Sequence, residues 1–512
     1  MLEFQNQRLE SAERIARSIL RVNSKDLVAL QVQGLCMAMQ GRIKESIEPF
    51  SKASNLDSKN PEILMNLGKA QHQSERYSDA AATFEKLNKI VPNNPQILTD
   101  LGTSYAKLRH YDGAKLAYEK AISLDPNYFL AYSNQGNLLA DQGYPDKALS
   151  SFERAIQLNS SYAEAWTNYG NALFDLGRFD DACKAHDQSL LCDPNYAEAW
   201  FNKGNCLTEL KQGESALEHY SKAFDLKRDI PYLIGQLINS LATHCIWDMN
   251  ETLVPIAIKE VEASKPSVPP FILLQTDASR SLQKKAAEIY IRERVPYISP
   301  TEYKPNSIGQ NSKLRIGYFS TDFKEHPVGI LLENIIRLHD RSHFEICGYF
   351  LNKKTEDRLE TALKSLFDTH YDLHGMHDID AHQLIVGHNL DIAIDLNGHT
   401  AGARTGLFAR KIAPLQINYL GYAGTMGASF YDYLITDQVA VPANFQDEFS
   451  EELVYLPNSF FPADTLIHPQ QFGLIPQRNS QGLPNEGFVF ASFNNSYKIT
   501  SKMFELWMRL LK

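Results

Sequence analysis

The chain has 512 residues, and its 51 Lys and Arg against 61 Asp and Glu give a net charge of −10, which argues against generic nucleic-acid binding. Its 43% hydrophobic and 22% charged residues are typical of a globular protein of about three domains and exclude disordered and fibrous classes. The first residues lack the cationic start and apolar core of a signal peptide, and the sequence has no apolar run of about 18 residues and no C-x-x-C pair among its six Cys. We therefore expect a cytoplasmic protein without a membrane segment or a structural metal.

In the first half, six glycines recur every 34 residues, a period typical of repeats built from two helices. A bulky side chain follows each glycine by 16 positions, so it can fill the space that the glycine leaves between paired helices. This pattern resembles the tetratricopeptide repeat and predicts an α-solenoid over residues 1–228. The glycines are Gly34, Gly68, Gly102, Gly136, Gly170 and Gly204, and the bulky residues are Phe50, Phe84, Tyr118, Phe152, His186 and Tyr220.

The position two residues before each glycine carries an amide in four of the six repeats. Asn is a mediocre helix former, so helix propensity does not explain this row. Carboxamides can donate to and accept from a peptide backbone, and the row resembles the asparagine ladder that holds the protein acceptor in protein O-GlcNAc transferases. The alternatives are amides that bond neighbouring helices, and a plain protein-docking scaffold. The row consists of Val32, Asn66, Asp100, Asn134, Asn168 and Asn202.

Residues 229–312 form a helical connector with proline-rich breaks. Beyond it, β-branched or apolar runs alternate with helical segments, which predicts a parallel sheet covered by helices, a Rossmann-like lobe over residues 313–480. Ligands bind beyond the carboxyl ends of the strands in such sheets. Polar or glycine-rich segments follow three predicted strands and indicate a site there: residues 321–327, 397–404 and 420–427. The predicted strands are LRIGYFS, FEICGYFL, LDIAIDLNG, LQINYLGY, YDYLITD and FVFASF.

Taken alone, these segments are only moderately specific. His326 also suits a turn histidine bonded to backbone, His399 suits a cap of the following helix, and the glycines suit tight turns. The sequence has no G-x-G-x-x-G, G-x-x-x-x-G-K-[ST] or H-E-x-x-H motif, so dinucleotide, Walker-type phosphate and zinc-protease chemistry lack support. The acidic pair Asp378 and Asp380 lies in a polar segment, and we interpret it as solvated surface.

Together, the strings DFKEHPVG, IDLNGHTAGARTGLFA, APLQINYLGYAGTMGASFYDYLITD, LPNSFF and FASFNNSYKIT resemble the catalytic region of protein O-GlcNAc transferases and their plant Spindly-type relatives, glycosyltransferases of two Rossmann-like lobes (GT-B). The resemblance implies an inverting, metal-independent transfer from a nucleotide sugar such as UDP-GlcNAc to a Ser or Thr hydroxyl of a protein, without a cofactor. It implies catalytic roles for His326, beside the sugar and the acceptor, and for Lys498, at the diphosphate. It also implies substrate contacts for His399, Leu420, Gly421 and Asn495.

At the C-terminal end, residues 481–512 contain one predicted strand and one predicted helix, which are too few for a lobe. We expect them to begin a second lobe that is mostly missing, so that the chain by itself is inactive. The leading hypothesis is a protein O-GlcNAc transferase-like enzyme whose partners are protein acceptors and a nucleotide sugar. Two alternatives stay open. One is Spindly-type protein O-fucosyl transfer from GDP-fucose, because the FNN of residues 493–495 resembles the Spindly string, and the other is a non-catalytic scaffold.

Overall fold

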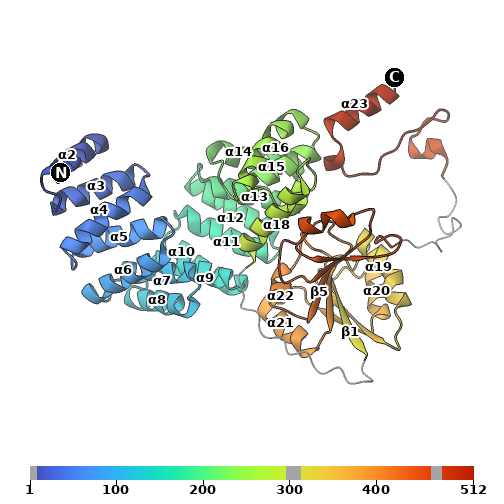
Figure 1. The fold of residues 1–512 in the computed structure, drawn as a ribbon, viewed down its shortest axis with the longest axis horizontal. Coiled ribbons are helices and arrows are strands. Elements are labelled where there is room, and N and C mark those ends of the chain that lie inside the picture. Colours follow the sequence, from blue (N-terminus) through green and yellow to red (C-terminus); the bar gives the residue numbers. More distant parts are fainter. Residues whose placement is uncertain (1–7, 296–312, 463–475) are drawn as a thin grey trace. The chain divides into compact units, whose positions relative to one another are not determined.

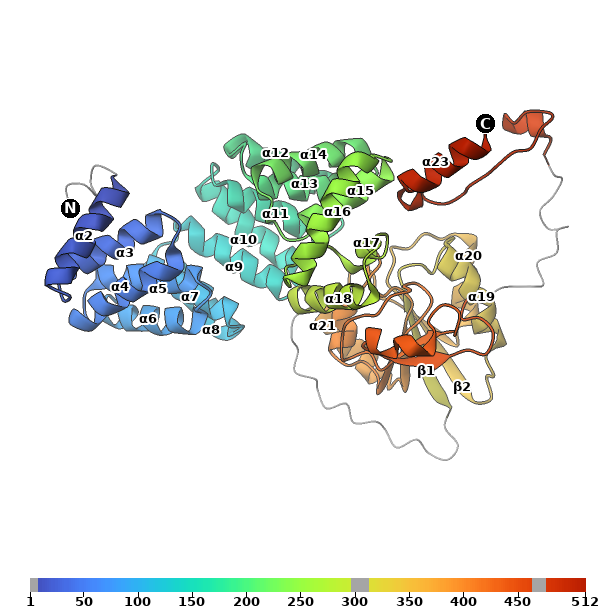
Figure 2. The same ribbon diagram turned by 45° about the horizontal axis from the view of Figure 1, so that its top comes forward.

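The computed structural model describes residues 8–295, 313–462 and 476–512. Its contacts divide the chain into two compact units, Met1–Leu210 and Lys211–Lys512. The first unit is built of helices, and the second combines helices with one sheet (Figures 1 and 2). No helix among the described residues is long and apolar enough to cross a membrane.

The first unit is a stack in which a first and a second helix alternate. Each first helix presents its repeat glycine to the ring of the second: a Cβ added to Gly34 would lie 2.6 Å from the Phe50 ring, and one added to Gly136 would lie 2.6 Å from the Phe152 ring. Only glycine fits at these contacts, and the predicted tetratricopeptide solenoid is confirmed. The helices are α2 (Leu9–Val22), α3 (Leu27–Met39), α4 (Ile43–Leu56), α5 (Pro61–Gln73), α6 (Tyr77–Ile90), α7 (Pro95–Lys107), α8 (Tyr111–Leu124), α9 (Phe129–Asp141), α10 (Pro145–Leu158), α11 (Ala163–Asp175), α12 (Phe179–Cys192) and α13 (Ala197–Glu209).

Local sequence sets several of these helix starts. The side chains of Asn60 and Asn94 accept hydrogen bonds from the first backbone N–H groups of α5 and α7. Pro61 and Pro95 follow as the first helical residues, where the fixed φ of proline suits a helix and its missing N–H is not needed. These two helices therefore begin where the sequence places an Asn-Pro pair.

The second unit starts with helices and continues into the sheet. Its elements are α14 (Gly213–Leu226), α15 (Leu233–Thr243), α16 (Trp247–Glu262), α17 (Pro270–Leu273), α18 (Arg280–Arg294), β1 (Leu314–Ser320), α19 (Pro327–Leu338), β2 (Phe344–Phe350), α20 (Arg358–Leu366), β3 (Thr369–Asp372), α21 (Asp378–Gly387), β4 (Ile392–Asp395), α22 (Thr405–Ala409), β5 (Leu415–Asn418), β6 (Tyr433–Thr436), β7 (Glu452–Tyr455), η4 (Ser496–Lys498) and α23 (Ser501–Leu510). Helix α14 continues the repeat period, although the compact units divide before it, at Leu210. The predicted domain boundaries at residues 228, 312 and 480 stay predictions.

The sheet has seven parallel strands in the order β3-β2-β1-β4-β5-β6-β7. Helices α19 and α20 cover one face, where Leu332 and Leu359 are buried, and α21 and α22 cover the other, where Ile385 and Phe408 are buried (Figure 1). The strand order reverses between β1 and β4. In open sheets of this kind that switch point is where ligands bind, beyond the carboxyl ends of the strands.

Five of the six predicted strands form in the sheet, and FVFASF is the exception. Residues 488–493 have no regular secondary structure, and the Phe488 and Phe493 side chains are exposed. Within the described residues no strand pairs with this run, and an unpaired strand is not stable in water. The strands that sequence reasoning missed, β3 and β7, are four-residue edge strands without a long apolar run.

The C-terminal residues of the described chain lie against α15 and α16. Trp247 Nε1 donates to the Ile499 carbonyl at 2.9 Å, Ser496 Oγ donates to the Thr243 carbonyl at 2.6 Å, and the Trp247 and Phe504 rings are 5.2 Å apart. Helix α23 itself has no buried residue. The helix predicted after FVFASF therefore forms, but it packs on the helical part of the unit and not on a second sheet.

Candidate active site at the carboxyl ends of the strands

The loops that follow β1 and β4 meet at the switch point through one buried amide, Asn397. Its Oδ1 accepts from the Thr321 N–H at 2.8 Å, and its Nδ2 donates to Thr321 Oγ1 at 2.7 Å and to Asp322 Oδ2 at 3.3 Å. The Asn397 side chain is fully buried. A fixed amide of this kind sets the position of the β1 loop relative to β4, and with it the position of the residues that follow.

His326 ends the β1 loop and caps α19. Its Nδ1 accepts from the Val328 N–H at 3.3 Å and lies 3.7 Å from Asp322 Oδ1, and its side chain is 41% exposed. Because Nδ1 accepts a hydrogen bond, the neutral ring carries its proton on Nε2, which is available to an incoming group. The arrangement agrees with the backbone-bonded turn histidine and also leaves His326 open for chemistry.

The glycine-rich loop after β5 is pressed against the end of β4. A Cβ added to Gly421 would lie 1.8 Å from the Leu396 carbonyl oxygen, so no other residue fits there without moving backbone. Leu420 adopts a left-handed φ of 71°, which a branched side chain rarely does. Leu420 and Gly421 thus form a strained, tightly packed edge beside the switch point, where the sequence predicted a substrate contact.

His399 is an interior residue, with 9% of its surface exposed. Its Nε2 donates to the Met426 carbonyl at 2.9 Å, and its ring lies edge-on to Tyr290 and Tyr422. Burial lowers the pKa of His399 to about 4, so the ring is neutral at physiological pH. The structure gives it the task of holding the loop of residues 420–427, and a direct contact with substrate stays a prediction.

Two buried carboxylates complete the support of these loops, and sequence reasoning missed both. Asp395 accepts hydrogen bonds from Tyr431 Oη and from the backbone N–H groups of Asn397 and Gly398. Glu451 accepts from Thr425 Oγ1 at 2.7 Å and from the Met426 N–H at 2.6 Å. Burial raises the pKa of both carboxyls. In the sequence, the one feature that could have pointed to either residue was the position of Asp395 at the end of an apolar strand.

The acidic pair after β3 was interpreted as solvated surface. Asp380 is exposed and the Asp378 side chain is 37% exposed, but Asp378 also forms an ion pair that the sequence did not predict. Arg404, in the segment after β4, donates to Asp378 Oδ1 at 2.6 Å and also to the Leu373 and Met376 carbonyls. The guanidinium is mostly buried and ties the glycine-rich segment of residues 397–404 to the start of α21. Arg404 and Asp378 are 26 residues apart in the sequence, so the polarity of the residues around Asp378 could not predict this ion pair.

Lys498 and Asn495 are not brought to this site by any contact of the described residues. Both are exposed, and Asn495 Nδ2 donates to the neighbouring Tyr497 Oη at 3.1 Å. The segment that carries them is held by α15 and α16. Their predicted roles at the diphosphate and at the sugar therefore stay predictions. In the described part of the chain, no group of three or more His, Cys, Asp or Glu side chains can hold a metal ion.

The row two residues before the repeat glycines consists of half-buried side chains, apart from Val32, which is buried. Asn134 Nδ2 donates to Thr103 Oγ1 of the preceding repeat at 3.4 Å. Within the described residues, the other three amides have no side-chain hydrogen bond. Asp100 has a buried Oδ2 without a partner, and burial raises its pKa to about 6. The ladder stays a prediction. The other members of the row are Asn66, Asn168 and Asn202.

Comparison with known sequence families agrees with this architecture. Residues 264–473 match glycosyl transferase family 41. Tetratricopeptide repeats match residues 38–75, 99–162, 133–195 and 197–229. The chain thus joins tetratricopeptide repeats to a region that is similar to glycosyl transferase family 41, and the predicted resemblance is confirmed.

Among curated proteins, the chain is 31% identical over 293 residues to the probable UDP-N-acetylglucosamine peptide N-acetylglucosaminyltransferase SEC of Arabidopsis thaliana, covering 54% of this chain and 30% of the relative. It is 38% identical over 159 residues to the Caenorhabditis elegans UDP-N-acetylglucosamine peptide N-acetylglucosaminyltransferase (31% and 14%), and 32% identical over 209 residues to the probable enzyme SPINDLY of Petunia hybrida (40% and 22%). The chain spans less than a third of the length of these relatives. A solved structure, a mutant of the Thermobaculum terrenum O-GlcNAc transferase, is 22% identical with a TM-score of 0.43, covering 75% of this chain and 66% of that one.

Proposed function

We propose that the chain belongs to a protein Ser/Thr O-glycosyltransferase that transfers a sugar, GlcNAc from UDP-GlcNAc, to hydroxyls of a protein held along the repeats. The observation that carries the proposal is His326, half-exposed at the switch point of a family 41 region, with Asp322 beside it and Asn397 fixing the loop. The names of the relatives in Arabidopsis and Caenorhabditis support the donor. The free cysteines support a cytoplasmic setting.

The proposed chemistry divides between the acceptor and the leaving group. The acceptor hydroxyl must lose a proton as it attacks the anomeric carbon and the bond from that carbon to the diphosphate breaks, so the site needs both a proton acceptor and a hydrogen-bond donor. Because Nδ1 of His326 accepts from Val328, the Nε2–H of the neutral ring can donate to a phosphate or sugar oxygen, while Asp322 is the neighbouring proton acceptor. The N-terminus of α19 adds a positive dipole at the same place. Lys498 is proposed to stabilise the diphosphate without a metal.

The test measures transfer of labelled GlcNAc to a Ser/Thr-rich peptide by the 512-residue chain, and by a chimera that continues after Lys512 with the C-terminal part of the Arabidopsis relative. We expect transfer by at least one of these proteins from UDP-GlcNAc. Transfer from GDP-fucose alone would instead support the O-fucosyl alternative. The FNN sequence of residues 493–495 and the similarity to the SPINDLY relatives favour that alternative. Peptide binding without transfer from either donor would support the scaffold.

In the active protein, His326→Ala should lower turnover about 10²–10⁴-fold, because a positioned acid or base contributes that much. The control is His343→Ala. This residue is an exposed histidine that follows the C-terminal end of α19 and pairs with Asp340. Initial rates at saturating donor, with circular dichroism to check folding, provide the measurement. Near-normal turnover of His326→Ala would leave His326 with its capping role alone.

The amide row is testable by acceptor binding. Replacement of Asn66, Asn134, Asn168 and Asn202 by Ala should weaken binding of a labelled acceptor peptide, because each amide that bonds a backbone contributes about 0.5–1.5 kcal/mol. The matched control is the pair Asn127→Ala and Asn195→Ala, exposed turn residues of the same array. A large loss of thermal stability with unchanged peptide affinity would show that the amides serve helix packing instead.

A further inference from the structure

Two cysteines of the repeat array lie opposite each other where two neighbouring helices pack. Cys183 lies on the second helix α12, and Cys206 lies on the first helix of the next repeat, α13. The exposed fractions of the two residues are 9% and 0%, and both thiols are free. We call these two residues the cysteine pair.

The 34-residue period explains why the two positions meet. A residue of each second helix and the residue 23 positions later, on the next first helix, occupy the places of the cysteine pair. At two such places the residues pack in one cluster: Ile47 with Ala70, and Leu149 with Ala172. The position of Cys206 carries a small residue in five of the six pairs, so the helices approach closely there. The other pairs are Glu13 and Cys36, Ile47 and Ala70, Ala81 and Ser104, Lys115 and Leu138, and Leu149 and Ala172.

The two thiols interact directly and have unequal acidities. Hydrogen bonding to Cys206 lowers the pKa of Cys183 against the effect of burial, and the Lys203 ammonium lowers it further, while the carboxylates of Asp187 and Asp180 act in the opposite direction. Hydrogen bonding to Cys183, together with burial, raises the pKa of Cys206. Asp187 Oδ1 accepts from Lys203 Nζ at 2.6 Å and so holds the ammonium between the two helices. Cys183 is therefore the member of the pair that forms a thiolate, and Cys206 is the thiol that donates to it.

Cys183 is also the member of the pair that a small oxidant can reach. Lys115 occupies the same position in another repeat with a side chain that is 63% exposed, so this position lies at the border between the helix contact and solvent. Cys206 has no exposed surface. A reachable thiolate beside a second thiol is the arrangement that favours oxidation to a disulfide.

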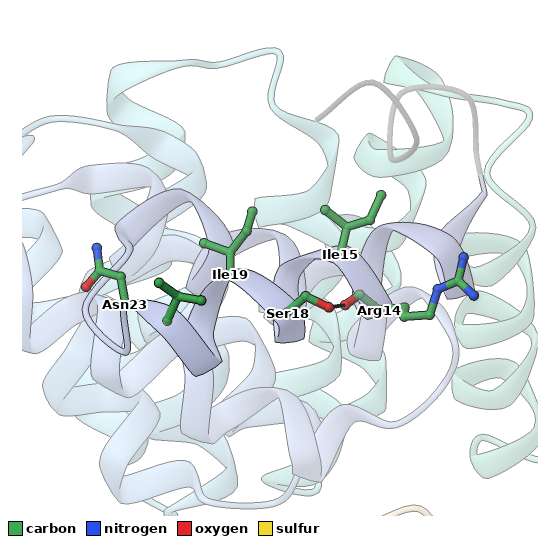
Figure 3. Close-up of a pocket in the computed structure, with 6 residues that line it drawn as sticks. Arg14, Ile15, Ser18, Ile19 and Asn23 are labelled. Atoms are coloured by element: carbon green, nitrogen blue, oxygen red, sulfur yellow. Dashed lines mark hydrogen bonds between the residues drawn. The ribbon is translucent and has the colours of Figure 1, made fainter.

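A second cysteine of the array has a different residue opposite it. Cys36 occupies the position of Cys206, but its counterpart on α2 is Glu13, which forms ion pairs with two arginines. Figure 3 shows this helix, where Ile15 and Ile19 line a shallow pocket whose lining contains no thiol. Burial and the Glu13 carboxylate raise the pKa of Cys36. Cys36 is therefore an internal control, a buried thiol that should stay reduced.

We propose that the cysteine pair is an oxidation site, at which a peroxide converts the two thiols into a disulfide bond between α12 and α13. The Cys183 thiolate attacks one peroxide oxygen, the O–O bond breaks, and Cys183 becomes a sulfenic acid. The Cys206 sulfur then attacks the sulfenic sulfur, the S–O bond breaks, and water leaves with the Cys206 proton. With hydrogen peroxide, the two thiols lose two protons and two electrons, and the peroxide is reduced to two waters. A dithiol reductant restores both thiols.

The bond ties the second helix of one repeat to the first helix of the next. Because each repeat contacts only its neighbours, a cross-link at this place fixes one step of the solenoid, the step between the repeats that carry Asn168 and Asn202. The oxidation site is separate from the candidate active site, and the proposal does not depend on the transfer reaction.

The test treats the full 512-residue chain with hydrogen peroxide, blocks the remaining thiols with iodoacetamide and analyses tryptic peptides by mass spectrometry. We expect residues 179–184 to be linked to residues 204–211, with the summed mass of the two peptides less two hydrogens, and dithiothreitol to remove the link. Cys36 should be recovered alkylated. Exposed Cys192 lies in a separate tryptic peptide and reports that the oxidant acted. The oxidised chain should also unfold at a higher urea concentration than the reduced chain, because a cross-link restricts the unfolded state.

Cys206→Ala is the matched variant, because Ala70 and Ala172 occupy this position in other repeats. It should keep the circular dichroism of the wild type, form no linked peptide and leave Cys183 as a sulfenic acid that dimedone traps. Cys192→Ser is the control and should keep the link. The proposal is overturned if Cys192 is oxidised while the linked peptide is absent. It is also overturned if Cys183 links to a cysteine other than Cys206, or if the link forms as fast in concentrated urea as in the folded chain.

Discussion

Two buried carboxylates of the sheet lobe (residues 313–462) and two polar side chains of the repeat array (residues 8–210) differ in how well they are hydrogen-bonded. In the lobe, Asp395 and Glu451 are buried, and each accepts at least two hydrogen bonds that hold the loops of the candidate site. In the array, His186 is fully buried with neither ring nitrogen bonded, and Asp100 keeps a buried oxygen without a partner. An unpaired buried polar group costs free energy, whereas a paired one fixes geometry.

The difference follows from how the two regions are built. Each repeat contacts only its neighbours. The other repeats carry Phe or Tyr at the position of His186, so the free energy lost through its unpaired nitrogens affects one repeat and its neighbours and leaves the rest of the stack folded. The lobe has loops that are far apart in sequence and must meet at one edge, so its buried polar groups are needed to join them. The following predictions test that contrast, in order of decreasing effect at pH 7.

The largest effect is expected from Gly421→Ala in the lobe. The added Cβ would lie 1.8 Å from the Leu396 carbonyl oxygen, and backbone has to move to make room. We expect a loss of at least about 4 kcal/mol in the unfolding free energy of the lobe, with the array unaffected. Urea unfolding followed by circular dichroism, with limited proteolysis to separate the two regions, measures this. Gly387→Ala, which meets nothing within 4 Å, is the control.

The second effect is a gain in the array from Asp100→Asn, which places an amide in the row. Burial raises the pKa of Asp100 from 3.8 to about 6, so the folded state binds the proton more tightly than the unfolded state. Wild-type stability should therefore fall as pH rises from about 4 to about 6, and stay lower above that. At pH 7 the variant should be more stable by about 3 kcal/mol, since the shift of about 2.2 pKa units corresponds to 1.36 kcal/mol per unit.

The control for this gain is Asp112→Asn, an exposed aspartate at the start of α8, which should not change the pH dependence. Thermal unfolding from pH 4 to pH 7 provides the measurement. A difference between wild type and Asp100→Asn that is the same at pH 4 and pH 7 would contradict the buried, unpaired carboxylate as its cause.

The smallest effect at pH 7 is expected from His186→Phe, which restores a ring like those of Phe50 and Phe152. Burial lowers the pKa of His186 from 6.5 to about 3, so the unfolded state binds the proton more tightly. At pH 7 the ring is neutral in both states, and the variant should gain about 1 kcal/mol from the loss of two unpaired nitrogens. As pH falls from about 6.5 towards 3, wild type should lose stability that the variant keeps.

If wild type and His186→Phe lose stability equally as the pH falls, a group other than His186 causes the acid unfolding. Among the described residues, His399 is the other buried histidine with a lowered pKa, to about 4, and it lies in the lobe. Proteolysis of each region along the same pH series therefore tells which region loosens first in acid. A lobe that loosens before the array would place the cause in the lobe.

The site was predictable from sequence in outline and not in detail. The segments after β1, β4 and β5 were found because polar and glycine-rich runs follow apolar strands, and parallel strands bring their carboxyl ends to one edge. His326, Leu420 and Gly421 were singled out in this way. Asp395 and Glu451 were missed, because no local sequence pattern marks a buried carboxylate. Their roles depend on hydrogen-bond partners that are distant in sequence, 36 residues away for Asp395 and 25 residues away for Glu451.

The sequence by itself determined the repeat array, because the period of 34 residues encodes contacts between neighbours, and these are local by construction. It also determined the strand segments whose apolar runs are long. Only the tertiary structure decided that FVFASF is not a strand among the described residues, that Asp378 is paired with Arg404, and that His399 holds a loop from the interior. The first depends on the lack of a pairing strand, and the other two depend on a partner distant in sequence. Such a contact stabilises the structure only once the chain has folded and brought the two residues together.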